Sequence, residues 1–323
     1  NQEHGLLPSS QWRDHVKWTI YSDPISDHEK LWGNSRLDHA QMRNISWIDD
    51  IRPLKLLKQE LKAYLQDAET VYTREIRGFP KEKITSPDPL LRSLRMVKIS
   101  EEIEKIREAI RVTKVAHDHI RTIMKPWMYE YEIEAEIARI FRAHHMTEAY
   151  PSIVASGTNA CTLHYTRHDR KFEAWNLVLV DAGAEYEGYA ADITRVFSVW
   201  EISLRQKEVY DSVLTVKQYA ESTIRPWVKK IEYEKIVRER MNVELEKLWL
   251  IPKNTSWKEL EVLSRKYYPH STSHFLGLDV HDTGDRDEVF EAGMVITCEP
   301  GIYIPEEGIG IRLEDDILIT ESG

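Results

Sequence analysis

The chain of 323 residues contains only two cysteines, Cys161 and Cys298. So few cysteines exclude the disulfide-rich scaffolds of small secreted domains and indicate a reducing compartment. No apolar run approaches the roughly 20 residues that a membrane-spanning helix needs. The first ten residues also lack the basic and then apolar pattern of a signal peptide. We therefore expect a soluble, cytoplasmic protein, with organellar targeting by a removed N-terminal segment as the open alternative.

The chain also lacks an excess of positive charge. Its formal net charge is -10 and its isoelectric point is near 5.8. Proteins that bind nucleic acid or anionic lipid usually carry a basic field that attracts phosphate groups. We therefore expect neither nucleic acid nor a membrane as a partner. Internal repeats and low-complexity tracts are absent as well, which excludes solenoid and linker-like architectures.

Turn-forming residues mark a break in the chain near residues 79–89. One glycine and three prolines fall close together between two helical patterns: Gly78, Pro80, Pro87 and Pro89. The break predicts two domains, covering residues 1–90 and 91–323. With 41% hydrophobic residues, this length can bury one large core and a smaller companion.

The two predicted domains differ in completeness. The first has a helical pattern over residues 54–65 and a strand pattern over 69–73, which is too little for a complete α/β domain. We expect a partial one. In the second, helical patterns begin at Ser100 and cover residues 133–141 and 209–220. Strand patterns cover residues 177–180, 193–199, 294–297 and 317–320. The fold class predicted for the second domain is mixed α/β, with helices covering one curved sheet.

Five residues in or beside the predicted strands are of the types that bind hard or borderline divalent cations. They are Asp181, Asp192, His274, Glu299 and Glu314. Asp181 ends an apolar run and Asp192 follows eleven residues later, which suits two antiparallel strands joined by a hairpin. Two further predicted strands deliver Glu299 and Glu314. Four carboxylates at one point repel unless cations neutralise them, so the pattern indicates two metals with bridging carboxylates. An acid that ends a strand in water is the alternative, and spacing alone leaves the two interpretations evenly matched.

Six ordered motifs in residues 94–320 resemble the pita-bread metallopeptidases, and among them aminopeptidase P. They cover residues 163–166, 177–183, 188–195, 273–282, 293–303 and 308–316. The resemblance implies a pita-bread catalytic domain with a curved antiparallel sheet. It also implies a metallo-exopeptidase that hydrolyses the bond between an N-terminal residue and a following proline. The expected partners are peptides with proline in second position.

The resemblance assigns roles to the five candidate ligands. It implies that Asp181 binds one metal, that Asp192 and Glu314 bridge both, and that His274 and Glu299 complete the other site. Manganese is the expected ion, and cobalt or zinc would also suit this donor set. A water between two divalent metal ions would be the nucleophile, and Glu299 would also move the proton.

The resemblance extends to four further residues of the substrate pocket. It implies that His164 and His281 contact the scissile carbonyl and the residues on either side of it. His270 matches another pocket histidine, although Ser271 follows where relatives usually carry glycine, and a surface loop histidine is the alternative. Arg312 would orient the acids or one end of the substrate, with an ordinary surface arginine as the alternative.

Two other nucleophiles are poor candidates. Cys298 should point to the sheet face opposite Glu299, which predicts a small buried hydrophobic residue. Ser271 and Ser273 lie near His274, but no glycine-framed nucleophile turn accompanies them.

The chain departs from the family pattern at several tryptophans. Trp127, Trp175 and Trp227 stand where relatives usually have turn glycines, and a Cβ atom makes a positive φ costly. Residues 29–37, with Trp32, faintly resemble a segment that in some relatives reaches the active site of a neighbouring subunit. A homo-oligomer therefore stays open.

Two alternative functions remain at this point. A prolidase would take only dipeptides, but the short segment between Asp282 and Glu291 favours an open cleft for longer peptides. A non-catalytic binding protein with the same fold is the second alternative. Retention of all five ligand types argues against it.

Overall fold

The computed structural model describes residues 19–21, 50–67, 69–73 and 84–322. Trp32 and residues 79–83 of the predicted break at residues 79–89 lie outside these ranges. The chain divides into two compact units, residues 1–88 and 89–323. The division lies two residues before the predicted boundary.

The described part of the first unit consists of short elements. Strand β1 (Ile20–Tyr21) pairs in parallel with β2 (Ile51–Arg52), and β3 (Val71–Tyr72) pairs in parallel with β4 (Ile84–Thr85). A 3₁₀ turn, η2 (Leu54–Leu56), leads into helix α3 (Leu57–Asp67). The helix and the strand predicted from the sequence are both present, although the strand is shorter than expected.

Helices of the second unit bury apolar faces with helical spacing. In α5, for example, Ile106, Ala109, Val112, Ala116 and Ile120 are all buried. The elements are α4 (Asp88–Met96), α5 (Ser100–Ile123), α6 (Glu130–Ala143), η4 (Gly157–Cys161), α7 (Leu204–Thr223), α8 (Lys230–Lys247) and α9 (Trp257–Tyr267).

Three of these helices, α4, α8 and α9, were not predicted. Helix α8 shows why: its buried positions include Lys230 and Glu244 beside Val237 and Met241. Charged residues therefore occur all around this helix, and its apolar spacing does not stand out in the sequence.

Ten strands of the second unit form four short sheets. The strands are β5 (Thr147–Glu148), β6 (Ile153–Ser156), β7 (Leu177–Ala182), β8 (Ala184–Tyr186), β9 (Tyr189–Ala190), β10 (Ile193–Ser198), β11 (Val295–Cys298), β12 (Gly301–Ile304), β13 (Ile309–Arg312) and β14 (Asp315–Leu318). The sheets have the orders β10-β7-β6, β5-β8-β9, β11-β14 and β12-β13. Every pairing among these named strands is antiparallel.

The sheet arrangement corrects two expectations. The curved surface is built from short sheets side by side and not from one continuous ladder. Glu314 joins two of them, because its backbone amide donates to the carbonyl of Thr194 at 3.2 Å. The strand predicted over residues 317–320 is wrong by two residues, since β14 covers Asp315–Leu318.

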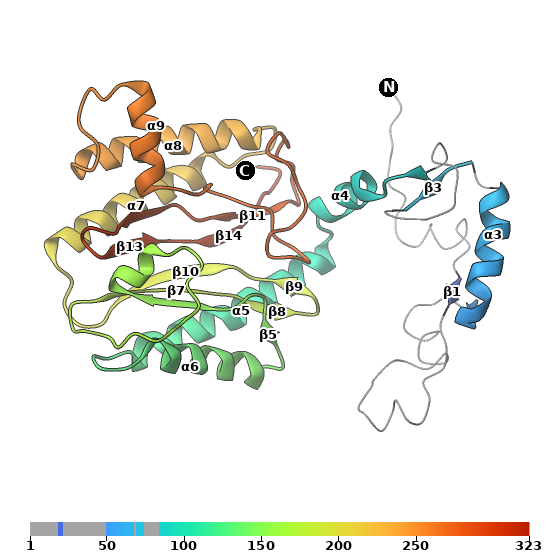
Figure 1. The fold of residues 1–323 in the computed structure, drawn as a ribbon, viewed down its shortest axis with the longest axis horizontal. Coiled ribbons are helices and arrows are strands. Elements are labelled where there is room, and N and C mark those ends of the chain that lie inside the picture. Colours follow the sequence, from blue (N-terminus) through green and yellow to red (C-terminus); the bar gives the residue numbers. More distant parts are fainter. Residues whose placement is uncertain (1–18, 22–49, 68, 74–83, 323) are drawn as a thin grey trace. The chain divides into compact units, whose positions relative to one another are not determined.

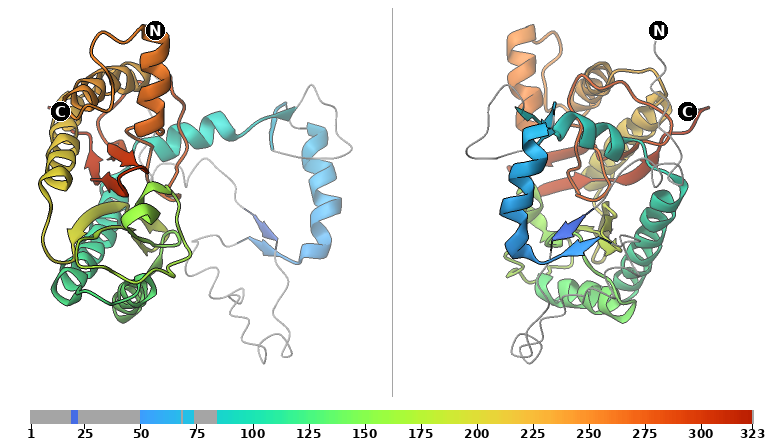
Figure 2. Two further views of the ribbon diagram at one scale, coloured as in Figure 1. Left: turned by 60° about the vertical axis from the view of Figure 1, so that its left-hand side comes forward. Right: turned by 90° about the vertical axis from the view of Figure 1, so that its right-hand side faces the viewer.

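The core of the second unit has two main parts. Helices α5 and α6 pack with β6 and β7 around Phe141 and Phe172, and helices α7 and α8 pack with β11, β12 and β13 around Tyr233 and Met241. Figure 1 shows the strands between the two helix pairs, and Figure 2 shows the same arrangement from two further sides. The two helix pairs thus hold the strands that carry the site.

Both helix pairs turn in the same way. Trp127 has a φ of 76° and donates its amide to the carbonyl of Phe172 at 3.0 Å, and Trp227 has a φ of 74° and donates to Phe290 at 2.8 Å. Both tryptophan side chains are exposed. The positive φ explains why glycine suits these two turns. Trp175 does not have a positive φ.

Candidate metal centre and active site

One pocket of about 380 Å³ in the second unit gathers the residues singled out in the sequence. All nine line it: His164, Asp181, Asp192, His270, His274, His281, Glu299, Arg312 and Glu314. They come from segments up to 150 residues apart in the sequence, counting from His164 to Glu314. Their convergence is therefore a product of the tertiary fold.

Two antiparallel strands position Asp181 and Asp192. Asp181 lies in β7 opposite Thr194 of β10, and Asp192 directly precedes β10. The predicted neighbouring strands are present, but they are not joined by a simple hairpin. The connection folds into its own hairpin, β8 and β9, which belongs to a different sheet.

Glu299 and Glu314 lie at strand ends and not within strands. Glu299 directly follows β11, and Glu314 falls in the short gap between β13 and β14. The expectation that a strand carries Glu314 is therefore corrected. Leaving the ladder frees the Glu314 amide for Thr194, whose hydroxyl donates to the Glu314 carboxylate at 2.5 Å.

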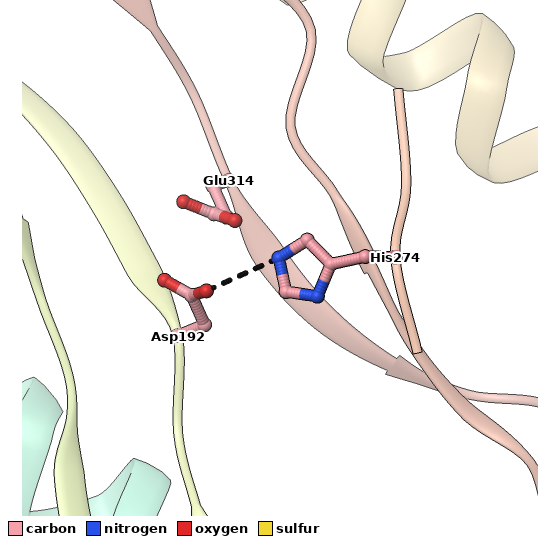
Figure 3. A group of neighbouring side chains, drawn as sticks. All are labelled: Asp192, His274 and Glu314. Atoms are coloured by element: carbon pink, nitrogen blue, oxygen red, sulfur yellow. Dashed lines mark ion pairs between the residues drawn. The ribbon is translucent and has the colours of Figure 1, made fainter. Parts of the chain in front are cut away.

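Three side chains stand close enough to share one cation. Asp192, His274 and Glu314 each offer a ligand atom, and these atoms lie within 4.8 Å of one another. The Nε2 atom of His274 is 3.3 Å from Asp192 Oδ2. Figure 3 shows the two carboxylates and the imidazole pointing toward one another from separate segments.

The other two carboxylates adjoin this group. His274 Nε2 lies 3.6 Å from Glu299 Oε1. The hydroxyl of Tyr150 donates to both Asp181 and Asp192, at 2.6 Å to the latter, and so ties these carboxylates together. Asp181, Asp192 and Glu314 are all buried.

Burial makes these charges costly. It raises the pKa of Glu299 to about 8, and with the nearby charge of Asp192 it raises the pKa of Glu314 well above its usual value. Burial opposes the charged form of His274, but the carboxylates of Asp192 and Glu299 outweigh it and raise the pKa of this imidazole to about 9. Such a cluster resists full ionisation unless positive charge is supplied, which divalent cations do.

The donor set fits divalent cations. Four buried or nearly buried carboxylates and one imidazole form an oxygen-rich site that suits manganese, cobalt or zinc better than thiolate-seeking metals. Among the described residues, Asp192, His274 and Glu314 are the tightest group of this kind.

Three histidines surround the carboxylates. The ring of His281 lies 4.3 Å from that of His274 and 6.5 Å from that of His164. Burial, with the neighbouring His274, lowers the pKa of His281, so its imidazole is neutral at pH 7. Neutral imidazoles can donate or accept one hydrogen bond with a substrate carbonyl or amine.

His270 belongs to the pocket and not to a surface loop. Its Nε2 atom is 2.8 Å from the hydroxyl of Tyr303, and its pKa is lowered to about 3 by burial and by Arg312. Arg312 is buried, donates to the Tyr303 hydroxyl at 2.9 Å and forms an ion pair with Asp181. It therefore orients an acid of the cluster.

A second cavity of about 310 Å³ adjoins the first. The two share His164, Asp181, Asp192 and His281, and the second adds apolar side chains such as Ile153 and Val280. It gives the site room for a substrate side chain beside the carboxylates.

Some site residues were not predicted. Tyr150 lies outside the named strands, and a single tyrosine there gives no signal of its own. Thr194 and Tyr303 fall inside recognised motifs, so their position could have suggested a role. Lys230 lines the pocket from the start of α8. Since α8 was not predicted, this lysine had no place in the expected site.

Cys298 has the surroundings predicted for it. It is fully buried in the core around α7 and α8, and burial raises the pKa of its thiol to about 12. A thiol so hard to ionise is a poor nucleophile. None of the helices in the described ranges combines the length and the apolar composition of a bilayer-spanning segment.

Relatives of known sequence match most of the chain. The Xaa-Pro aminopeptidase of Escherichia coli is 34% identical over 91% of this chain and 75% of its own length. The Xaa-Pro aminopeptidase of Haemophilus influenzae is 39% identical over 73% of this chain and 58% of its own length. The chain thus spans from somewhat more than half to three quarters of these relatives.

Solved structures agree with the fold. Proline aminopeptidase P II from Yersinia pestis superimposes with a TM-score of 0.83, 32% identity and coverage of 94% of this chain and 78% of that one. Aminopeptidase P from Escherichia coli with the inhibitor Pro-Leu has a TM-score of 0.84, 32% identity and coverage of 94% and 77%. The predicted pita-bread fold class is confirmed. The model of metallopeptidase family M24 matches residues 104–321. The chain belongs to metallopeptidase family M24.

Proposed function

We propose that this protein is a metal-dependent Xaa-Pro aminopeptidase, which releases an N-terminal residue that precedes proline. The observation that carries the proposal is the buried group of carboxylates around His274, at the floor of a pocket lined by three further histidines. Two relatives that are similar along most of the chain, from Escherichia coli and Haemophilus influenzae, are Xaa-Pro aminopeptidases, which supports the same substrate class.

We assign two divalent cations to the five ligands. Asp181 would hold one, Asp192 and Glu314 would bridge both, and His274 and Glu299 would complete the second. Manganese is the proposed native ion. When bound, the cations supply Lewis acidity that polarises the scissile carbonyl and lowers the pKa of an attacking water.

The protein side chains then have separate tasks. Glu299 can accept a proton from the attacking water and pass it to the leaving amine. His164 and His281 can hydrogen-bond the oxygen that gains charge in the transition state. Arg312 holds Asp181 in place through their ion pair.

Proline suits this pocket for a simple reason. Its ring removes the amide hydrogen of the scissile bond and fixes φ, so a site that binds that hydrogen would reject it. Histidine side chains can instead contact the ring and hydrogen-bond the carbonyl oxygens. The short segment after Asp282 leaves the cleft open to peptides longer than a dipeptide.

Residues 1–90 are proposed to form an N-terminal α/β domain, followed by the catalytic domain. Both cysteines are free, which supports a reducing compartment such as the cytoplasm.

The test compares Xaa-Pro-Xaa, Xaa-Ala-Xaa and Xaa-Pro peptides with manganese present, after chelation, and after manganese is restored. We expect cleavage of Xaa-Pro-Xaa only, loss on chelation and recovery with manganese, with little effect of thiol reagents. Equal rates on the alanine peptide would remove the proline specificity. Activity confined to the dipeptide would make the protein a prolidase, and a protein that never takes up metal would be a binding module.

A further inference from the structure

Glu130 is a buried carboxylate outside the metal pocket that the mechanism above does not use. It is the first residue of α6 and has no exposed surface. Its oxygens accept hydrogen bonds from five groups: the amide of Ser156 (2.7 Å), the hydroxyl of Ser156 (2.8 Å), the side-chain amide of Asn159 (3.1 Å), the hydroxyl of Tyr165 (2.7 Å) and the amide of Arg170 (3.0 Å).

All five donors belong to one segment, residues 156–170, which carries His164. After η4 this segment has no strand or helix up to residue 170. His164 makes no side-chain hydrogen bond within the described part of the chain, and its ring lies 6.5 Å from that of His281. The position of His164 therefore depends on how the segment around it is held.

The residue next to His164 is the most firmly held. The hydroxyl of Tyr165 donates to Glu130, accepts from Asn159 at 2.8 Å, and lies 3.0 Å from Asp169. Tyr165 is itself buried. A side chain fixed at its far end leaves little freedom to the backbone that it shares with His164.

Among the described residues, no arginine or lysine side chain pairs with the Glu130 carboxylate. The guanidinium of Arg170 instead contacts Thr158 Oγ1 at 2.6 Å and Glu173 at 3.6 Å. Glu130 is thus stabilised by neutral donors and by the N-terminus of α6, where negative charge is favourable. Removing its charge would leave several buried donors with a weaker or missing acceptor.

We propose that Glu130 is a positioning residue that fixes residues 156–170 and so holds His164 against the carboxylate cluster. The inference rests on the proposed function for its kinetic consequence. It does not rest on it for the anchoring of the segment.

The experiment uses Glu130→Gln in the full chain with manganese bound. The carboxamide keeps the shape but replaces one acceptor oxygen by a donor, which opposes the donors around it. We expect kcat on Xaa-Pro-Xaa to fall roughly 10- to 100-fold, because a misplaced catalytic group costs about that much. KM should change less than kcat, and metal content should stay at the wild-type level.

A double variant separates positioning from general damage. If Glu130 acts through His164, Glu130→Gln combined with His164→Ala should be no slower than His164→Ala alone. Glu136→Gln on the same helix is the matched control, since its carboxylate pairs with His119 and Arg139 on the surface. It should keep wild-type kinetics.

Tyr165→Phe gives the second route if Glu130→Gln does not fold. It removes one donor from the network and should lower kcat in the same direction, with the same lack of additivity with His164→Ala. A folded Glu130→Gln variant with unchanged kcat, or effects that multiply with those of His164→Ala, would overturn the proposal.

Amide hydrogen exchange tests the anchoring of the segment without measuring peptidase activity. Exchange of the amides of Ser156 and Arg170 should accelerate in Glu130→Gln and not in Glu136→Gln. Should the wild type fail to cleave Xaa-Pro-Xaa, the proposed function fails while this measurement still decides the anchoring. Unchanged exchange rates of these amides in Glu130→Gln would show that Glu130 does not anchor residues 156–170.

Discussion

The carboxylates and the histidines of the pocket reach it by different routes. Asp181 lies within a strand, and the other three proposed carboxylate ligands lie one residue from a strand end. His164, His270 and His281 instead lie in segments without strand or helix. Backbone ladders thus position the carboxylates of the proposed metal site, whereas the histidines of the proposed substrate site depend on side-chain anchors.

The anchors of the histidine segments are charged residues on helices behind the pocket. Arg95 of α4 contacts Asp282, next to His281, at 2.6 Å. Glu234 of α8 accepts the two backbone amides that directly precede His274, at 2.8 and 3.1 Å. A loop fixed by ion pairs and side-chain bonds is only as rigid as those partners. A substitution of Arg95 should therefore disturb catalysis before metal binding, whereas one of Glu234 should disturb both, because His274 is a proposed ligand.

The largest effect should come from the strand side. Asp192→Asn or Glu314→Gln is expected to lower kcat/KM by about 10³-fold or more and to reduce bound metal, because a bridging ligand holds both cations. Peptide kinetics and metal analysis of the same samples measure the two effects. Asp118→Asn, a surface carboxylate paired with Lys114, is the control and should change neither. Near-normal turnover with full metal content in either variant would refute the bridging roles.

A buried histidine outside the pocket, His117 of α5, should affect stability and not catalysis. His117 of α5 is buried, and its pKa is lowered to about 4 by burial and by Arg195. The unfolded chain would take up this proton below about pH 6.5, whereas the folded protein does so only near pH 4. The folded state therefore loses stability as pH falls through this window, by about 3 kcal/mol, since each pKa unit corresponds to about 1.4 kcal/mol.

Urea unfolding of the wild type and of His117→Leu at a series of pH values measures this loss. From pH 7 to pH 4, the free energy of unfolding of the wild type should fall by about 3 kcal/mol relative to that of His117→Leu. His145→Asn, which replaces an exposed histidine, should run parallel to the wild type. A wild type and a His117→Leu variant with parallel pH profiles would show that His117 does not couple folding to protons.

On the histidine side, His281→Ala should reduce kcat/KM on Xaa-Pro-Xaa by about 10²-fold with metal content unchanged. The imidazole would act on the transition state more than on the ground state, so kcat should carry most of the loss. Xaa-Ala-Xaa is the comparison peptide. Loss of metal in this variant would show that His281 supports metal binding, and so contradict the separation of metal ligands from substrate-binding histidines.

The smallest effect concerns the two matched turns. Trp127→Gly and Trp227→Gly should each raise the free energy of unfolding by about 1 kcal/mol, because glycine relieves a positive φ that costs a residue with a Cβ atom about 1 to 2 kcal/mol. Thermal and urea unfolding measure the gain. Trp175→Gly has no positive φ to relieve and should not stabilise. Destabilisation by the first two variants would mean that their exposed rings contribute more than the strain costs.

Much of the fold was predictable because the signals are local. Apolar runs fixed β7 and β10, and apolar residues at helical spacing fixed α5, α6 and α7. Helix α8 was missed because it buries charged residues, and β14 was misplaced because Asp315 begins it where an acid suggests a loop. In α8 the buried charges pair within the helix, as Glu244 does with Arg240 and Lys247, whereas Asp315 is satisfied by a tertiary contact with Lys217.

The sequence alone determined which residues could bind metal and which family pattern they follow, since ligand type and motif order are properties of the linear chain. Only the tertiary structure decided that Tyr150 ties Asp181 to Asp192, and that Glu130 lies beneath the segment of His164. These contacts join residues 31 to 42 positions apart in the sequence. Hydrogen bonds between such distant groups form only when packing brings them together, and no local propensity encodes that encounter.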